Sequence, residues 1–407
     1  MKTLDGKNNE AIIFTDEDID SIVSTRITDL LNTKMTNGLV VRIMPNVCSS
    51  FNNITGYTQT YSGELLDPDI ISDYGCGVLA VKYKLEKELN LELIKQKIKR
   101  TIPIGNSVNK KLVVEKKEFY KFIKRKLEKA RSLCPSFINY EGLNKIDKLI
   151  DQIIKKFDID EDLFWHSLGT LGGGDHFIEL GQEDNDKNSI WVIIHTGSRN
   201  LGSKFQNYWK KLISKTRILK EELKEAESNI KTEYRGDHSK IKEELIKLHD
   251  SGKFTIPPSR FITTREDVSD YLCDSIFIQS YAEFNRLTIL NQIVNKKVLK
   301  LGKEIDKIDS IHNYIDPLDL IIRKGAIKLN KGESTIITLN QNLGSIIVES
   351  IEDNANWNFS VPSCLGKLSD GNYKDIELFK KELTTVRINK IIKPLITIKN
   401  ETNRLYY

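Results

Sequence analysis

The stretch LGTLGGGDHFIELG, residues 168–181, places three consecutive glycines directly before an acid, a histidine and an apolar run. Glycine in an ordered element costs roughly 0.5–1 kcal/mol relative to alanine, so three in a row need a physical reason. The usual reason is a backbone that bends sharply or passes close to another group, and the alternative is an ordinary loop tip. Because an apolar run follows, we expect a turn that presents Asp175 and His176 at the start of a strand.

Strand and helix patterns alternate irregularly along the rest of the chain. The expected strands are 39–48, 71–84, 189–197, short runs within 319–349, and 391–399, and the expected helices are 86–100, 115–132, 142–157, 268–295 and 374–390. This mixture lacks the regular βαβ alternation of a doubly wound fold, so we expect the α+β class. No internal repeat and no Pro-rich or Ser-rich linker divides the chain, so we expect a single domain over 1–407.

A charged segment, residues 206–257, is expected to be a helical insertion within this domain. Its runs KEELKEAE and KIKEELIK place Glu and Lys about four residues apart, which supports exposed helices. The pattern predicts one or two helices that project from the body as a hairpin or arm. A solvated hairpin is the simplest role, and a surface for RNA or for a partner protein is the alternative.

Composition limits the classes of protein to which the chain can belong. The 407 residues are 39% hydrophobic and 29% charged, which is enough apolar material for a sizeable core. The net charge of +5 allows an acidic partner such as nucleic acid without requiring one. No window is long and apolar enough to span a membrane, and the start MKTLDGKNNEAIIF has no signal-peptide core. We therefore expect a cytoplasmic protein with no membrane partner.

The five cysteines do not form a recognisable framework. They are odd in number, scattered and never in a CxxC pair, which argues against structural disulfides and against a zinc ribbon. A functional cysteine would therefore act as a single thiolate in a composite site.

Three of the six histidines lie at turns or strand ends. His176 follows the triple glycine, His195 ends a buried strand, and His312 lies just before another strand. Asp73 and Cys76 share the tight turn DYGCG. Each residue alone is more typical of a hydrogen-bonded structural group, but a rigid scaffold presents functional groups at such positions. One carboxylate, one thiolate and three imidazoles would suit a borderline divalent ion, or two ions that share the sulfur.

Five motifs occur along the chain in a fixed order: DYGCG (73–77), GTLGGGDHFIEL (169–180), HTGSRNLG (195–202), IHNY (311–314) and RKGA (323–326). Together they resemble the RtcB family of RNA-splicing ligases. The resemblance implies an α+β fold with central mixed sheets ringed by helices. It also implies a GTP-dependent enzyme with two Mn²⁺ ions, which joins an RNA 3′-phosphate or 2′,3′-cyclic phosphate to a 5′-hydroxyl. The expected partners are GTP and the ends of tRNA or damaged RNA. The family often has an activating protein as well, and we expect a monomer.

The resemblance implies a two-metal centre when it is carried over residue by residue. Asp73, Cys76 and His176 would hold one manganese ion. Cys76, His195 and His312 would hold the other, so that the thiolate bridges the two ions.

The resemblance also implies a guanine-nucleotide pocket. Glu179 matches the glutamate that reads the base edge, Tyr373 matches a tyrosine that stacks on the base, and Lys399 matches a lysine near the family's C-terminus. Asp175 stands where the family has an asparagine that contacts the guanylate. Arg199 matches the arginine of the family's GSRG turn and is expected to contact RNA.

The sequence departs from the family at the nucleophile. The family transfers GMP through a histidine within S-H-G-A-G-R, whereas the nearest stretch here is SVPSCLGK, 360–367. Ser363 and Cys364 stand at that position, and no histidine follows His312. Imidazole forms phosphoramidates readily, whereas a serine hydroxyl needs a base.

Other departures lie close to the expected phosphate positions. Asp175 brings a negative charge, TLNQN (338–342) replaces the family's P-G-S-M-G loop, and Cys48 replaces the histidine of its P-D-V-H motif. Three functions are compatible with this pattern. The first is an RtcB-type ligase with altered or lost guanylylation, in which Ser363 or Cys364 is the expected catalytic residue or the attack occurs directly at the metal centre. The second is a paralogue that binds metal and RNA ends without joining them. The third is a metal-dependent RNA phosphatase or nuclease, which needs no protein nucleophile.

Overall fold

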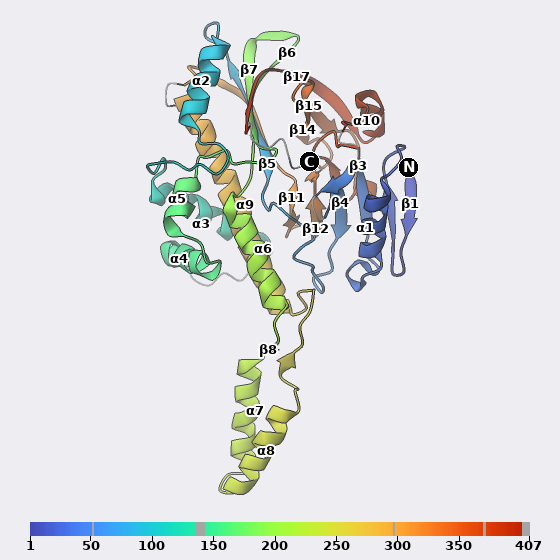
Figure 1. Ribbon diagram of the computed structural model, residues 1–407, viewed down its shortest axis with the longest axis vertical. Coiled ribbons are helices and arrows are strands. Elements are labelled where there is room, and N and C mark those ends of the chain that lie inside the picture. The colour runs from blue at the N-terminus through green and yellow to red at the C-terminus, as the bar shows by residue number, and fades with distance from the viewer. Residues whose placement is uncertain (51–52, 135–142, 296–297, 369–371, 401–407) are drawn as a thin grey trace.

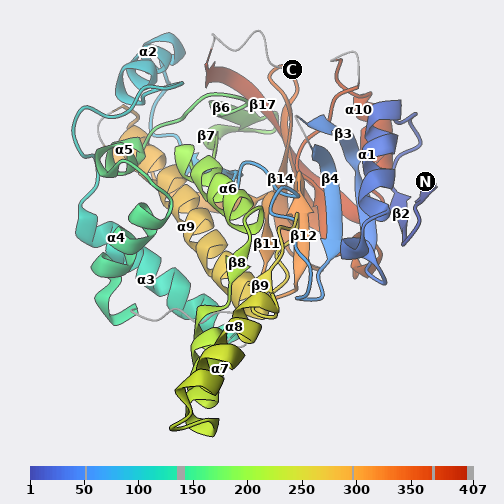
Figure 2. The same ribbon diagram turned by 60° about the horizontal axis from the view of Figure 1, so that its bottom comes forward.

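The computed structural model describes residues 1–50, 53–134, 143–295, 298–368 and 372–400. Two β-sheets form the middle of the body, with a large layer of helices on one side and fewer helices on the opposite side (Figures 1 and 2). A helical arm projects from the body (Figure 1). The α+β class and the expected arrangement of sheets and surrounding helices are confirmed.

The larger sheet has seven strands, and all of its neighbouring pairs are antiparallel. Their order is β10 (Glu304–Ile311), β5 (Gly77–Lys84), β7 (Asp186–Thr196), β6 (Phe177–Glu183), β17 (Val386–Lys399), β15 (Gly344–Ser350) and β14 (Ser334–Asn340). β5 and β7 are rich in Val and Ile, which suits strands that are buried on both faces. One face packs on α2 (Leu91–Thr101) and α9 (Arg265–Asn295) through residues such as Ile98 and Ile289.

The smaller sheet has six strands and is antiparallel except between β2 and β3. Their order is β1 (Lys2–Asp5), β2 (Glu10–Ile13), β3 (Val41–Ser50), β4 (Asn53–Thr60), β12 (Ile321–Lys324) and β11 (Asn313–Asp316). Helix α1 (Ser21–Leu31) covers this sheet, with Val23, Ile27 and Leu31 buried in the shared core. A separate ribbon pairs β13 (Ala326–Lys328) with β16 (Ser360–Pro362). Because β10 ends at Ile311 and β11 begins at Asn313, the chain passes from one sheet to the other at His312.

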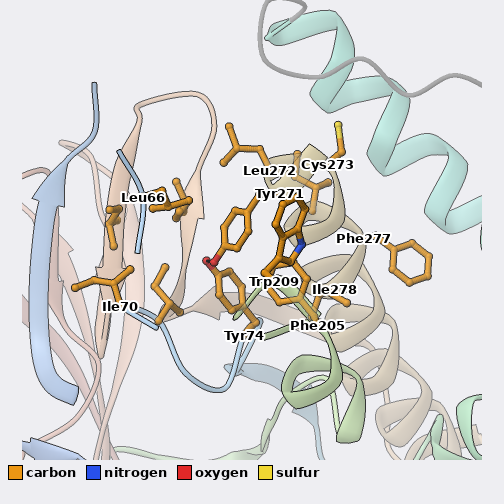
Figure 3. Packing of buried hydrophobic residues seen from close by; sticks show 14 of the residues in the cluster. Leu66, Ile70, Tyr74, Phe205, Trp209, Tyr271, Leu272, Cys273, Phe277 and Ile278 are labelled. Carbon is orange, nitrogen blue, oxygen red and sulfur yellow. Dashed lines mark hydrogen bonds between the residues drawn. The ribbon is translucent and has the colours of Figure 1, made fainter. Parts of the chain in front are cut away.

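The helical layer packs around α9. It contains α3 (Lys116–Leu133), α4 (Ile146–Lys156), α5 (Glu161–Ser167) and α6 (Asn200–Ile213). Aromatic rings fill the core beside α9 and α6 (Figure 3). The hydroxyls of Tyr74 and Tyr271 lie 2.5 Å apart, and Phe205 packs edge-on against Tyr74 with ring centroids 5.0 Å apart. Tyr74 therefore anchors the DYGCG turn in the core.

The arm consists of α7 (Lys220–Glu233) and α8 (His238–Asp250), and neither helix has a buried residue. Two short strands, β8 (Arg217–Ile218) and β9 (Thr255–Ile256), join it to the body. The arm starts later than the predicted boundary at 206, because α6 continues to Ile213 and buries Trp209 in the core. Helical spacing of apolar residues in this part of the segment, rather than its charge, decides its environment.

Other element boundaries also differ from the sequence-based ones. The helix expected over 374–390 is only α10 (Ile376–Glu382), and Val386 begins β17. Alternating apolar residues from Val386 onward pair with β15 and prevail over the helical interpretation. Residues 71–76 form a turn rather than a strand, and residue 142 of the expected helix lies outside the described residues. The remaining short helices are η1 (Lys34–Thr36), η2 (Leu143–Lys145) and η3 (Ala355–Trp357). Among the described residues, no helix has both the length and the apolar character that a membrane crossing requires.

Candidate active site

Five predicted metal ligands lie together in two overlapping groups. Asp73, Cys76 and His176 form one group, and Cys76, His195 and His312 form the other, each with its ligand atoms within 4.8 Å of one another. The Cys76 Sγ atom lies 3.5 Å from His176 Nε2 and 3.2 Å from His195 Nε2. His195 Nε2 in turn lies 3.4 Å from His312 Nε2. One thiol is therefore shared by two donor sets.

The turn that carries Asp73 and Cys76 depends on unusual backbone angles. Asp73 and Gly75 have φ values of 53° and 76°, and the Cys76 amide donates a hydrogen bond to the Asp73 carbonyl oxygen at 3.2 Å. Gly77 then begins β5 against β10, where a β-carbon would overlap the carbonyl oxygen of Ser310. The glycines of DYGCG thus allow the turn and the close approach of the strand that leads to His312.

Backbone carbonyls orient two of the imidazoles. His176 Nδ1 lies 3.0 Å from the carbonyl oxygen of Leu171, and His195 Nδ1 lies 3.3 Å from that of Asp175. An Nδ1–H that donates to a carbonyl leaves Nε2 as the free lone pair, and such partners fix the tautomer of metal-binding histidines. Both Nε2 atoms then face Cys76 with the lone pair that a cation needs.

The glycine-rich turn makes room for Arg199 beside His176. A β-carbon on Gly172, whose φ is +88°, would overlap the Arg199 guanidinium and lie 3.0 Å from His176 Nδ1. Arg199 donates hydrogen bonds to Thr170 Oγ1 at 2.9 Å and to the Gly105 carbonyl oxygen at 2.8 Å. The turn therefore has a packing reason, and the strand expected after it begins at Phe177.

Burial keeps His195 and His312 neutral. It lowers the pKa of His195 to about 3, with help from the charge of His176, and it lowers the pKa of His312 well below its ordinary value. Burial and the carboxylate of Asp73 raise the pKa of the Cys76 thiol. Burial opposes ionisation of Asp73, but the neighbouring His176 ring, whose Nε2 lies 3.8 Å from Asp73 Oδ2, and the charge of Lys324 hold its pKa well below the usual range. A divalent cation would favour the thiolate, so the donor set fits a pair of borderline metal ions.

A fully buried arginine of α9 ties these segments together. Arg286 donates to the carbonyl oxygens of Gly75 at 3.1 Å and of Thr196 at 3.2 Å, and it pairs with Asp309 at 2.9 Å. Each of these three residues lies within three positions of a candidate ligand. The sequence reasoning did not single out Arg286, because a charged residue in a helix pattern is normally exposed.

One face of the larger sheet extends from the candidate ligands to Glu179. The strand register pairs His195 with Phe177, and Phe177 with Lys399, so these side chains share the face with Glu179 and its partner Thr397. Glu179 is only 3% exposed, and burial raises its pKa to about 7. Its Oε2 accepts a hydrogen bond from Thr397 at 3.3 Å, while its buried Oε1 has no partner within the described structure. A buried, unpartnered carboxylate oxygen fits a ligand that donates hydrogen bonds.

The other residues predicted for the nucleotide lie around this face. Lys399 is exposed and its Nζ lies 2.7 Å from Gln341 Oε1, which belongs to the TLNQN loop. Tyr373 is 46% exposed, and the ammonium of Lys367 lies 5.2 Å from the centre of its ring. Burial of the rest of the ring, with the charges of Asp175 and Cys364, raises the pKa of Tyr373.

Of the two residues at the expected nucleophile position, Ser363 is buried and Cys364 is partly exposed. Ser363 is 5% exposed, its amide donates to the Gly325 carbonyl oxygen, and its own carbonyl oxygen accepts from the Thr338 amide, both at 3.2 Å. Cys364 Sγ accepts from Asn46 Nδ2 at 3.5 Å. Burial raises the pKa of Cys364, and the charge of Cys48 adds to this effect. A thiol that resists ionisation is a weak nucleophile.

The fold and these residues define the class of protein, an α+β protein with a candidate two-metal centre where two sheets meet. The chain belongs to the RtcB family, because the family model described as tRNA-splicing ligase RtcB matches residues 35–364. This confirms the family resemblance of the five motifs.

Two curated relatives agree with this assignment. The chain is 23% identical over 334 residues to the RNA-splicing ligase RtcB of Escherichia coli strain K12, and the match covers 76% of this chain and 70% of that protein. It is 22% identical over 335 residues to the RNA-splicing ligase RtcB1 of Escherichia coli strain ATCC 25922, with the same coverage. The family match ends at Cys364, where the sequence departs from the expected nucleophile motif.

Proposed function

We propose that this protein is an RNA ligase that joins an RNA 3′-phosphate or 2′,3′-cyclic phosphate to a 5′-hydroxyl with two Mn²⁺ ions and GTP. The observation that carries the proposal is the pair of donor groups sharing Cys76, on the same sheet face as the unpartnered carboxylate of Glu179. The family membership and the names of the two relatives support the RNA-ligase class.

The metal centre suits chemistry at phosphorus. Phosphoryl and nucleotidyl transfer need alignment and charge neutralisation more than covalent work by the protein. Two divalent ions supply both by binding phosphate oxygens. In this proposal Asp73 and His176 hold one ion, His195 and His312 hold the other, and Cys76 contributes to both. Arg199, next to His176, contacts RNA.

The buried carboxylate of Glu179 suits guanine. The Watson–Crick edge of guanine carries two neighbouring N–H donors, and a carboxylate accepts both. The unpartnered Oε1 of Glu179 supports this role, because a bound base would supply the donor that the protein does not. Tyr373 offers a half-exposed ring for stacking, and Lys399 and Asp175 complete the nucleotide-binding set.

The missing histidine favours a second candidate function. Ser363 and Cys364 replace it, and the raised pKa of Cys364 disfavours its thiolate. A metal-dependent RNA phosphatase or nuclease needs no protein nucleophile, and a paralogue that only binds RNA ends needs none either. Both would retain the metal ligands.

An end-joining assay separates these functions. The purified protein is incubated with Mn²⁺, GTP and two RNA oligonucleotides, one with a 3′-phosphate and one with a 5′-hydroxyl. The proposal predicts a joined product that requires GTP and is lost in Cys76→Ser. Removal of the 3′-phosphate without joining would indicate a phosphatase, internal cleavage a nuclease, and tight RNA binding without chemistry a non-ligating paralogue.

A further inference from the structure

We propose that Lys324, rather than Ser363 or Cys364, accepts the guanylyl group from GTP in this protein. The inference rests on the proposed function, because it assumes that the protein uses GTP. It assigns a nucleophile to a family member that lacks the expected histidine, and it places that nucleophile in the RKGA segment of β12.

Lys324 lies between a candidate metal ligand and the segment where the nucleophile is expected. On one side, Lys324 pairs with Asn313, the neighbour of His312, in the register of β11 and β12. On the other side, the next residue, Gly325, accepts hydrogen bonds from the Ser363 amide at 3.2 Å and from Asn46 Nδ2 at 2.9 Å. Lys324 therefore lies between the strand that follows a candidate ligand and the segment that has lost the histidine.

The surroundings of the ammonium group point to the same place. Lys324 Nζ lies 3.4 Å from the carbonyl oxygen of Ser72, which directly precedes Asp73. The acidic groups that act on its charge are those of the turn and of the altered segment: Asp73, Cys76, Cys48 and Cys364. The ammonium therefore lies beside the turn that carries Asp73 and Cys76.

Lys324 differs from the other buried lysines of the described structure in having no ion pair. Lys82 pairs with Glu183 and Asp186 at 2.8 Å, and Lys374 pairs with Glu17 at 2.7 Å. Lys324 is equally buried, at 6% exposed, but within the described residues the one polar contact of its ammonium is the long hydrogen bond to Ser72. Burial of an ammonium that has no direct ion pair is costly, so this position favours either a neutral amine or a bound anion such as a phosphate. A lysine that reacts with a nucleotide phosphate uses both: the bound phosphate supplies the anion, and the neutral amine is the form that attacks it.

The chemistry balances without a further reactant. The ammonium releases one proton to solvent, and the neutral amine attacks the α-phosphorus of GTP. A nitrogen–phosphorus bond forms, the bond from the α-phosphorus to the bridging oxygen breaks, and pyrophosphate leaves. The second N–H proton goes to solvent, and the product is a lysyl phosphoramidate. Lysine is a recognised covalent nucleophile once desolvation disfavours its charge.

The test is to map the labelled residue. The full-length protein is incubated with Mn²⁺ and α-labelled GTP, denatured and digested, and the labelled peptide is sequenced by mass spectrometry. We expect label on Lys324, through a bond that is lost in mild acid and stable in base, as phosphoramidates are. In Lys324→Met the label should fall to background while manganese binding and the thermal midpoint are retained. Lys331→Met, in an exposed turn after β13, is the matched control and should be labelled like the unchanged protein.

The outcomes separate this inference from the proposed function. Label on Ser363, Cys364 or any other residue would overturn the role of Lys324 and leave GTP-dependent ligation intact. Absence of label from the unchanged protein, with GTP and manganese both bound, would overturn guanylylation itself. Because the mapping uses the unchanged protein, a Lys324→Met variant that fails to fold does not affect the conclusion.

Discussion

Replacement of Gly172 by alanine should weaken both the fold and the metal site. The φ of +88° costs an L-residue about 1–2 kcal/mol. The new β-carbon also overlaps the Arg199 guanidinium, which donates to Thr170 and Gly105. Loss of two charge-assisted hydrogen bonds costs at least about 1.5 kcal/mol each. The expected decrease in the free energy of unfolding is therefore about 4–5 kcal/mol.

Gly332→Ala is the matched control for this prediction. Gly332 has a φ of +78°, but a β-carbon there would meet no atom within 4 Å, so only the backbone cost of about 1–2 kcal/mol applies. Urea unfolding of both variants at neutral pH measures the difference. The reasoning is refuted if Gly172→Ala destabilises the protein no more than Gly332→Ala does. Manganese affinity should also fall in Gly172→Ala, by about 10–100-fold, because His176 loses its supporting environment.

Three further perturbations have expected outcomes. Cys76→Ala should lower the manganese stoichiometry by more than His312→Ala does, because the thiol serves both donor groups; metal analysis after dialysis measures this, and equal losses would contradict the shared ligand. Glu179 has a raised pKa of about 7, so relative to Glu179→Gln the protein should lose about 3 kcal/mol of stability as the pH rises from about 4.5 through 7. Urea unfolding across this range checks that sign, and a flat difference would show that the carboxyl is not desolvated. Replacement of residues 220–251 by a short Gly-Ser linker should change the thermal midpoint little, because neither arm helix has a buried residue.

The candidate ligands could be predicted from sequence because their signals are local. Each lies in a short motif whose glycines or β-branched neighbours indicate a turn or a strand end, as at Cys76 and His195. Residues at turns and strand ends can meet at one edge of a sheet, and the structure brings all five donor residues together. Their roles as metal ligands stay predictions until a metal is measured.

Contacts between distant segments could not be predicted from sequence. Arg286 contacts three segments that are more than 100 residues apart along the chain, and nothing in the pattern of α9 indicates which segments those are. The same limit applies to Lys324, since its burial depends on β4 and β11 as neighbours of β12. Periodicity predicts that a strand exists, but strand order depends on tertiary packing.

The passage of the chain from one sheet to the other at His312 has a mechanical consequence. His195 ends a strand of the seven-stranded sheet, and His312 is the last residue before the chain enters the six-stranded sheet. A cation bound to both histidines would cross-link the two sheets. Its binding free energy would add to their cohesion, by about 2.7 kcal/mol when the free ion exceeds its dissociation constant a hundredfold. Removal of the ion would then weaken the packing of the two sheets against each other. Backbone amide protons near this junction, in both sheets, should then exchange with solvent faster and by a similar factor.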